Sequence, residues 1–230
     1  MKSIYRISDM GYNKSKPKFI SNENCLANFV KTFGYDDLHI LADNTSKETN
    51  KIILKYVPES CVTYVSVGNG AGTFNLALDL ALTFNDNEII YFVENDYIHR
   101  PNSSKIIEEG ISLGATFVSL YDNPDKYLDP SEGGNPYCHG GAEDTRVYKT
   151  ENTHWKITNS TTMTFASKVS TLKEIEPVLR KHTQQTYPQD FKIFIELMQQ
   201  GHLTVVPIPG YSTHGEMDWL SPFINWEEYV

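Results

Sequence analysis

Short apolar runs alternate with helix-like stretches along the first 121 residues of the chain. Five of these runs are rich in β-favouring residues and predict strands at positions 3–8, 38–42, 61–67, 88–94 and 115–121. Between them, apolar residues recur on one helical face and predict helices at 21–34, 47–56, 68–82 and 101–114. This alternation is typical of an α/β fold with a Rossmann-like, mostly parallel central sheet flanked by helices.

The pattern changes after residue 121. Pro and Gly are frequent at 122–145, which predicts a long loop that we expect to be functional or mobile, a donor lid or ordinary disorder. Residues 147–164 predict extra strands that cover this loop, followed by helices at 170–181 and 187–200 and a closing strand at 203–207. We therefore expect a single domain over residues 1–230, with a first half at 1–121 and a second half at 122–230.

Composition limits the class of protein and of partner. The 230 residues are 40% hydrophobic, enough for a sizeable core, and their net charge of -9 disfavours a nucleic-acid partner. The three cysteines are odd in number and widely spaced, so we expect a reducing compartment. No apolar signal segment follows Met1, and no apolar run has the length that spans a bilayer. These features predict a cytoplasmic protein without a transmembrane segment.

Two carboxylates follow the fourth predicted strand, in the sequence Glu94-Asn95-Asp96. The carboxyl ends of parallel strands form the edge at which open α/β sheets bind their ligands. Two hard oxygen ligands at such an edge could hold Mg²⁺ or Mn²⁺ beside a phosphate-rich substrate. The plain alternative is an acidic turn, and the same choice applies to Asp9 and Asp43 at the ends of the first two strands.

A glycine-rich turn at residues 68–72 lies between the third predicted strand and the following helix. Such a turn lets the backbone approach a nucleotide, with Glu94 on the ribose hydroxyls, and it resembles the first motif of S-adenosylmethionine-dependent methyltransferases. Two strand-helix units precede the turn, whereas a methyltransferase would place it after its first strand. A methyltransferase that uses this turn and Glu94 is therefore the alternative prediction.

The order of motifs along most of the chain resembles GT-A glycosyltransferases, particularly the large inverting family 2 group. The order of elements also resembles the small glycosyltransferases of algal large DNA viruses. The matching motifs, in chain order, are Asn69-Gly70 with Asn75, Glu94-Asn95-Asp96 in place of an Asp-x-Asp metal motif, residues 164–168, Gln189-Asp190, Gly201, residues 205–207 and His214.

This resemblance implies a GT-A fold in which residues 1–121 bind the nucleotide sugar and residues 122–230 form a mobile loop and a smaller acceptor-side subdomain. It implies a divalent cation, Mn²⁺ or Mg²⁺, held by Asp96, Glu94 and His214, and Asp190 as the base that deprotonates the acceptor hydroxyl. The donor is expected to be a UDP-sugar and the acceptor a glycan or glycoprotein. The donor-binding residues implied are Arg6, Ser8, Asp9, Asp43, Asn69, Gly70, Asn75, Glu94 and Asn95.

The chain departs from the family pattern at two places. Glu94 stands in place of an Asp, and Gln189 replaces the first acid of a Glu-Asp pair, which leaves Asp190 as the remaining acid there. Asp190 could instead be a helix cap, and His214 an exposed histidine. A non-catalytic carbohydrate-binding module is a third function, although it would not need two acids at a strand end. If the chain is viral, the expected compartment is the host cytoplasm.

Overall fold

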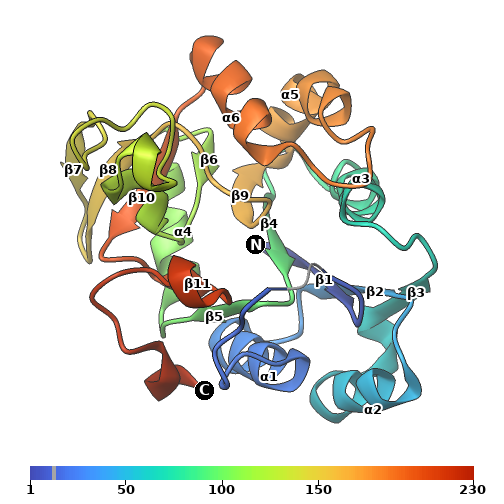
Figure 1. Ribbon diagram of the computed structural model, residues 1–230. Coiled ribbons are helices and arrows are strands. Elements are labelled where there is room, and N and C mark those ends of the chain that lie inside the picture. Colours follow the sequence, from blue (N-terminus) through green and yellow to red (C-terminus); the bar gives the residue numbers. More distant parts are fainter. Residues whose placement is uncertain (12–13) are drawn as a thin grey trace.

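A mixed central sheet organises the protein, as the ribbon in Figure 1 shows. The structure is a computed structural model that describes residues 1–11 and 14–230. From one edge to the other, the described strands of this sheet are β3 (Val62–Val65), β2 (Leu38–Asp43), β1 (Lys2–Ser8), β4 (Ile89–Glu94), β9 (Phe165–Lys168), β6 (Phe117–Val118), β10 (Thr204–Ile208), β8 (His154–Thr158) and β7 (Val147–Lys149).

The first four strands form the parallel part of the sheet. β1 pairs in parallel with β2 on one side and with β4 on the other, and β2 pairs in parallel with β3. The interior of β1 is buried, as expected of a parallel strand that helices cover on both faces. The strands predicted at 3–8, 38–42 and 88–94 are confirmed, and that at 61–67 is shorter than expected, because Cys61 ends a 3₁₀ turn and residues 66–67 lead into the glycine turn. Of the strand predicted at 115–121, only Phe117–Val118 pairs in the sheet.

Six helices are described: α1 (Asn22–Phe33), α2 (Lys47–Tyr56), α3 (Gly70–Ala81), α4 (Ser103–Ser112), α5 (Val169–Lys181) and α6 (Asp190–Gln199). The side chains of Ser21, Ser46 and Asn69 cap α1, α2 and α3 by accepting hydrogen bonds from backbone N–H groups of the first turn. α6 begins at Asp190, three residues later than predicted. None of the described helices is long and apolar enough to cross a membrane.

The second half of the sheet is mixed. β9 lies between β4 and β6 and pairs antiparallel with both, and β10 pairs in parallel with β6 and antiparallel with β8. The extra strands predicted at 147–164 are present as β7 and β8, which extend the main sheet at its edge. The long loop at 122–145 packs against β8 and the residues that follow it. Lys126 of the loop donates to Asn159 and Ser160, and Lys156 of β8 pairs with Asp122 at 3.1 Å.

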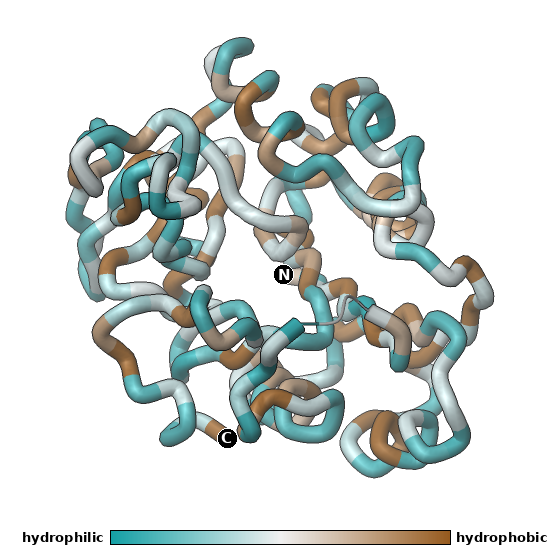
Figure 2. The backbone as a smooth tube through the Cα atoms, viewed as in Figure 1, coloured by the Kyte–Doolittle hydropathy of each residue, from teal (hydrophilic) through white to brown (hydrophobic). Residues whose placement is uncertain are grey.

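Two apolar cores fill the two faces of the sheet. On one face, α1 and α4 bury residues such as Phe29 and Ile107. On the other, α3, α5 and α6 bury residues such as Phe74, Leu172 and Phe194. The tube in Figure 2 alternates between hydrophobic and hydrophilic segments along these helices, as expected of helices with one buried side. The sheet is therefore covered by helices on both faces.

A small second sheet brings the C-terminal region back to the end of β4. β5 (Tyr97–His99) follows β4 directly and pairs antiparallel with β11 (Ser212–His214). Behind this pair, Ile20, Ile98 and Trp226 are buried together in a separate apolar cluster. The cluster holds the tail of the chain beside the strand end that carries Asp96.

We predict that Phe165→Ala lowers the free energy of unfolding by about 3–5 kcal/mol, because it would leave a cavity in the core. Phe165 is fully buried in β9 and its ring lies beside four phenylalanine rings from α3, β4, β6 and α6. The exposed control Leu54→Ala, on α2, should change this energy by less than about 0.5 kcal/mol. Urea denaturation measures the free energy of unfolding of both variants. An equally small loss in Phe165→Ala and Leu54→Ala would contradict the central place of β9 in the core.

Candidate functional site

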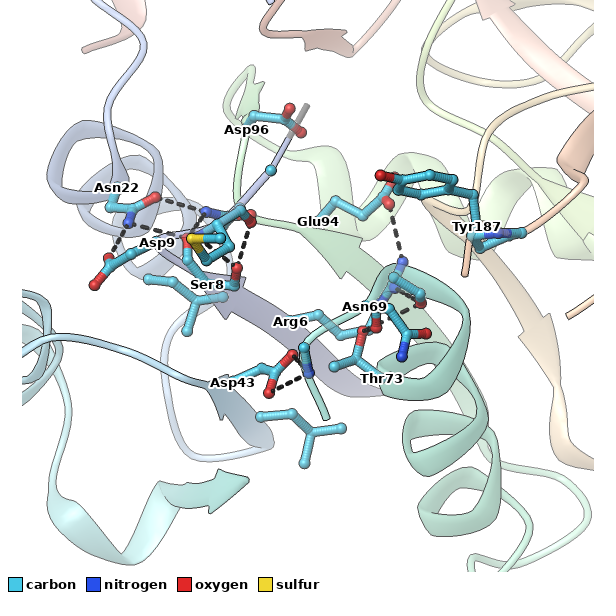
Figure 3. A pocket seen from close by; sticks show the side chains of 18 of the residues that line it. Arg6, Ser8, Asp9, Asn22, Asp43, Asn69, Thr73, Glu94, Asp96 and Tyr187 are labelled. Carbon is cyan, nitrogen blue, oxygen red and sulfur yellow. Dashed lines mark hydrogen bonds and ion pairs between the residues drawn. The ribbon is translucent and has the colours of Figure 1, made fainter. Parts of the chain in front are cut away.

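A cavity of about 580 Å³ opens at the carboxyl ends of β1, β2 and β4, beside the start of α3 (Figure 3). The cavity lies where the order of the parallel strands reverses, with β2 and β3 on one side of β1 and β4 on the other, and doubly wound sheets bind their ligands at such a point. Nine residues singled out from the sequence line it: Arg6, Ser8, Asp9, Asp43, Asn69, Gly70, Glu94, Asn95 and Asp96. Asn75, Asp190 and His214 are not among the lining residues.

Arg6 supplies a buried positive charge to the cavity. Its side chain is 6% exposed, Nη1 donates to the carbonyl of Gly70 at 3.1 Å, and Nη2 lies 3.1 Å from Glu94 Oε1. Nε has no hydrogen-bond partner within the described part of the protein. A buried guanidinium that lines a cavity is suited to an oxygen-rich or anionic ligand.

Asp43 holds the glycine turn in place. Its carboxylate accepts hydrogen bonds from the backbone N–H groups of Val67, at 2.7 Å, and Gly68, at 2.8 Å. Gly68 has φ +78°, a conformation that a residue with a side chain rarely adopts. Asn69 then caps α3 through a 2.7 Å hydrogen bond from the N–H of Gly72. The role of Asp43 in binding a nucleoside stays a prediction, and its role in shaping the turn is observed.

The polar tip of β1 is tied to its neighbours. Asp9 accepts hydrogen bonds from the Ser46 backbone N–H and the Thr49 hydroxyl, both at 2.5 Å, and so contacts the first turn of α2. Asn95 donates to the carbonyl of Ser8 at 3.1 Å. These contacts fix the backbone of one cavity wall, and the ligand-binding roles of the three residues stay predictions.

Asp96 and His214 lie side by side. The antiparallel register of β5 and β11 places His214 opposite Tyr97, the residue after Asp96. His214 Nε2 is 3.4 Å from Asp96 Oδ2. Gly215 permits this approach, since a Cβ atom there would lie 2.7 Å from the carbonyl oxygen of Asp96 and 2.6 Å from Ile20.

The groups around Asp96 favour its ionised form. Burial by itself would raise the pKa of Asp96, but His214, Lys14 and Lys16 outweigh it and hold that pKa well below its ordinary value. Lys14 Nζ lies 2.8 Å from His214 Nε2, and because an ammonium group can only donate, Nε2 carries the lone pair in this arrangement. Nδ1 of the same ring faces Glu216 Oε2 at 3.8 Å.

The fit of these residues to a divalent cation can be judged from the donors present. Within residues 1–11 and 14–230, no group of three His, Cys, Asp or Glu side chains converges to hold a metal ion. Glu94, predicted as a ligand, turns to Arg6 and Thr164 instead. Asp96 and His214 offer one carboxylate oxygen and one imidazole nitrogen, a set that suits a cation completed by water and substrate phosphates.

Asp190 lies at the start of α6 with a raised pKa. Burial is the main cause, with a contribution from the negative charge of Glu94, and the pKa rises to about 6 although the N–H of Phe191 donates to the carboxylate at 2.7 Å. Gln189, and not Asp190, occupies the N-cap position. Asn75 holds α3 to the end of α5, through hydrogen bonds with Thr183.

Several cavity residues were not singled out from the sequence. Lys14 and Lys16 bring positive charge to it, and Asn22, Thr73 and Tyr187 add polar or aromatic surface. The signal for the lysines was present, because Lys14, Lys16 and Lys18 fall within five residues of an otherwise acidic chain. The other three lie on helices or connections whose position over the strand ends depends on tertiary packing.

At the level of sequence, the chain matches no protein-family model and no curated protein. Its fold is similar to that of GalNAc-T7, in a crystal structure with UDP, GalNAc and Mn²⁺, with a TM-score of 0.57 and 13% identity over 93% of this chain and 42% of that chain. TarS from S. aureus, in complex with UDP-GlcNAc, gives a TM-score of 0.50 and 13% identity over 90% of this chain and 56% of that one.

A third similar structure is A197 from STIV, with a TM-score of 0.50 and 17% identity. The similarity covers 96% of this chain and 91% of A197. By contrast, the chain spans only about half the length of the GalNAc-T7 and TarS structures. At these identities the likeness concerns the fold. The chain therefore has a GT-A-like α/β fold, with a mixed central sheet, parallel core strands and flanking helices.

Proposed function

We propose that this protein is a metal-dependent glycosyltransferase, which moves a sugar from a UDP-sugar to a hydroxyl of a glycan or glycoprotein. The observation that carries the proposal is the pair Asp96 and His214, 3.4 Å apart beside a cavity of about 580 Å³ that Arg6 also lines. A cavity of this size falls within the range that holds a small organic ligand. The GT-A-like fold and two neighbours whose structures contain UDP or UDP-GlcNAc support this choice of donor.

In this proposal Asp96 and His214 hold Mn²⁺ or Mg²⁺ at the cavity. When bound, such a cation neutralises the charge that develops on a departing diphosphate. The chain adds its own positive groups to the same cavity, since Arg6, Lys14 and Lys16 line it. Glu94, paired with Arg6, orients the guanidinium toward the donor rather than ligating the metal.

Asp190 is the proposed base for the acceptor hydroxyl. A carboxyl group with a pKa of about 6 is ionised at neutral pH and is a stronger base than an ordinary aspartate. The Tyr137 ring, from the long loop, lies 6.1 Å from the ring of Phe191 and is half exposed. Exposed aromatic faces beside the base offer a surface on which an acceptor sugar could stack.

The methyltransferase alternative is not favoured by the sheet. The glycine turn follows β3, which is the edge strand, and its N–H groups at Val67 and Gly68 are engaged by Asp43. A nucleotide-binding turn of the Rossmann type would instead follow a strand at the point where the strand order reverses. Glu94, which would bind the ribose, is paired with Arg6.

We predict that UDP raises the melting temperature of the protein when Mn²⁺ is present and much less in EDTA. At a UDP concentration about 100 times Kd, the stabilisation should be about 2.7 kcal/mol, which corresponds to several degrees for a chain of this size. Asp96→Asn should remove the Mn²⁺ dependence, because it removes the charged oxygen ligand. Asp36→Asn, at an exposed site away from the cavity, is the matched control and should behave as the wild type.

The same thermal-shift panel distinguishes the other functions. Equal stabilisation by UDP in Mn²⁺ and EDTA would contradict the metal-dependent proposal. Stabilisation by S-adenosylmethionine alone would support a methyltransferase, and stabilisation by free sugars alone would support a carbohydrate-binding module.

We predict that the transfer rate rises about tenfold per pH unit below pH 6 and levels off above it. The folded-state pKa of Asp190 is raised, so the carboxyl stays protonated, and unable to accept a proton, up to about that pH. Asp190→Asn should lower kcat by about 10² to 10⁴ and leave UDP binding unchanged. Gln189→Ala, next to it, should keep the pH profile.

The melting temperature of Asp190→Asn tests the raised pKa of the Asp190 carboxyl group in a second way. Because the folded pKa is raised above the ordinary value of 3.8, the native carboxyl lowers stability as it ionises, and this penalty is absent at about pH 3, where the carboxyl is protonated in both the folded and the unfolded state. The Asn variant should therefore melt higher than the wild type at pH 7.5 and at the same temperature at about pH 3. An unchanged kcat in this variant would exclude Asp190 as the base.

A further inference from the structure

The ammonium group of Lys14 occupies the space beside the proposed metal ligands. Its Nζ lies 2.8 Å from His214 Nε2 and 3.4 Å from Asp96 Oδ2. A second ammonium, that of Lys16, lies 3.9 Å from the same Asp96 oxygen. The lysine side chain at 14 is 19% exposed and that of Asp96 is 11% exposed, so the contact is shielded from most of the solvent.

The segment that carries Lys14 is docked on the same part of the fold. The backbone N–H of Met217 donates to the carbonyl of Ser15 at 2.8 Å, which ties this segment to the tail after β11. Pro17 is buried, and Ile20 is 7% exposed and packs against Gly215. These contacts place the lysine over Asp96 and His214 by backbone and apolar interactions that do not involve its own charge.

The ammonium uses the atoms that a metal ion would need. The lone pair of His214 Nε2 accepts from Lys14 and cannot at the same time bind a cation, and Asp96 Oδ2 is the oxygen nearest to both lysines. A buried carboxylate without a positive partner is costly, so the lysine stabilises Asp96 whenever no metal is bound. The two cations are therefore mutually exclusive at this pair.

We propose that the ammonium group of Lys14 takes the place of the metal ion at the candidate metal site of the free protein. It holds Asp96 and His214 there, and a divalent metal has to displace it. The inference rests on the proposed function, since it concerns the same two ligands. Competition of this kind raises the apparent Kd of the metal in inverse proportion to the fraction of molecules in which the lysine is displaced. It also links metal binding to the donor, because the displaced ammonium lines the same cavity and an anionic diphosphate would attract it.

Titration of Mn²⁺ in the absence of nucleotide, followed by electron paramagnetic resonance of the free ion, tests this inference. Lys14→Met keeps the length of the side chain and removes its charge, and it should bind Mn²⁺ at least about threefold more tightly than the wild type. Lys14→Arg, which keeps a cation, should not. Lys18→Met makes the same charge change at an exposed position and controls for the overall charge of the segment.

Melting temperatures give a readout that does not depend on activity. In EDTA, Lys14→Met should melt below the wild type, because Asp96 loses its nearest ammonium, and saturating Mn²⁺ should abolish this difference. Equal Mn²⁺ affinity in the wild type and Lys14→Met would overturn the inference and leave the metal site intact. Absence of Mn²⁺ binding in both proteins would overturn the metal site itself, and with it the role of Lys14.

Discussion

The antiparallel pairing of β5 with β11 is the constraint on which the proposed chemistry depends. Without it, Glu94-Asn95-Asp96 would be an acidic turn at the end of a strand. The pairing sets His214 opposite Tyr97, and Gly215 allows the two segments to approach until the imidazole lies 3.4 Å from the Asp96 carboxylate. The apolar cluster around Trp226 supports the pairing from behind. The candidate site thus combines His214, from the C-terminal region, with Asp96, which follows the parallel strand β4.

Neighbouring groups of the protein balance the negative charges of the carboxylates that line the cavity. The protein is acidic, with a net charge of -9, and four carboxylates line the cavity in which the proposed anionic donor would bind. Each of these is engaged: Asp9 by the start of α2, Asp43 by the N–H groups of the glycine turn, Glu94 by Arg6, and Asp96 by His214 and lysines. Their charge is therefore offset locally, and phosphate oxygens in the cavity would not face uncompensated carboxylates.

The sequence predicts those parts of the fold and site that local pattern encodes. The strand-helix alternation up to β4 follows from apolar periodicity and helix caps, and the acids at strand ends meet at one edge because parallel strands end together. β9 escapes prediction because its four residues gain strand geometry only from pairing with β4 and β6. The turn of Glu94 toward Arg6 and the position of Lys14 over Asp96 depend on side-chain contacts between distant segments, which no spacing records.

The central claim is that Asp96 and His214 bind a divalent cation that meets the diphosphate of the donor. The most direct measurement is anomalous diffraction at the manganese absorption edge from crystals grown with Mn²⁺ and UDP. The account predicts an anomalous peak about 2.0–2.6 Å from an Asp96 oxygen and from His214 Nε2, with UDP phosphate oxygens on its open side. A peak elsewhere, or UDP bound outside the cavity at the ends of β1 and β4, would contradict it.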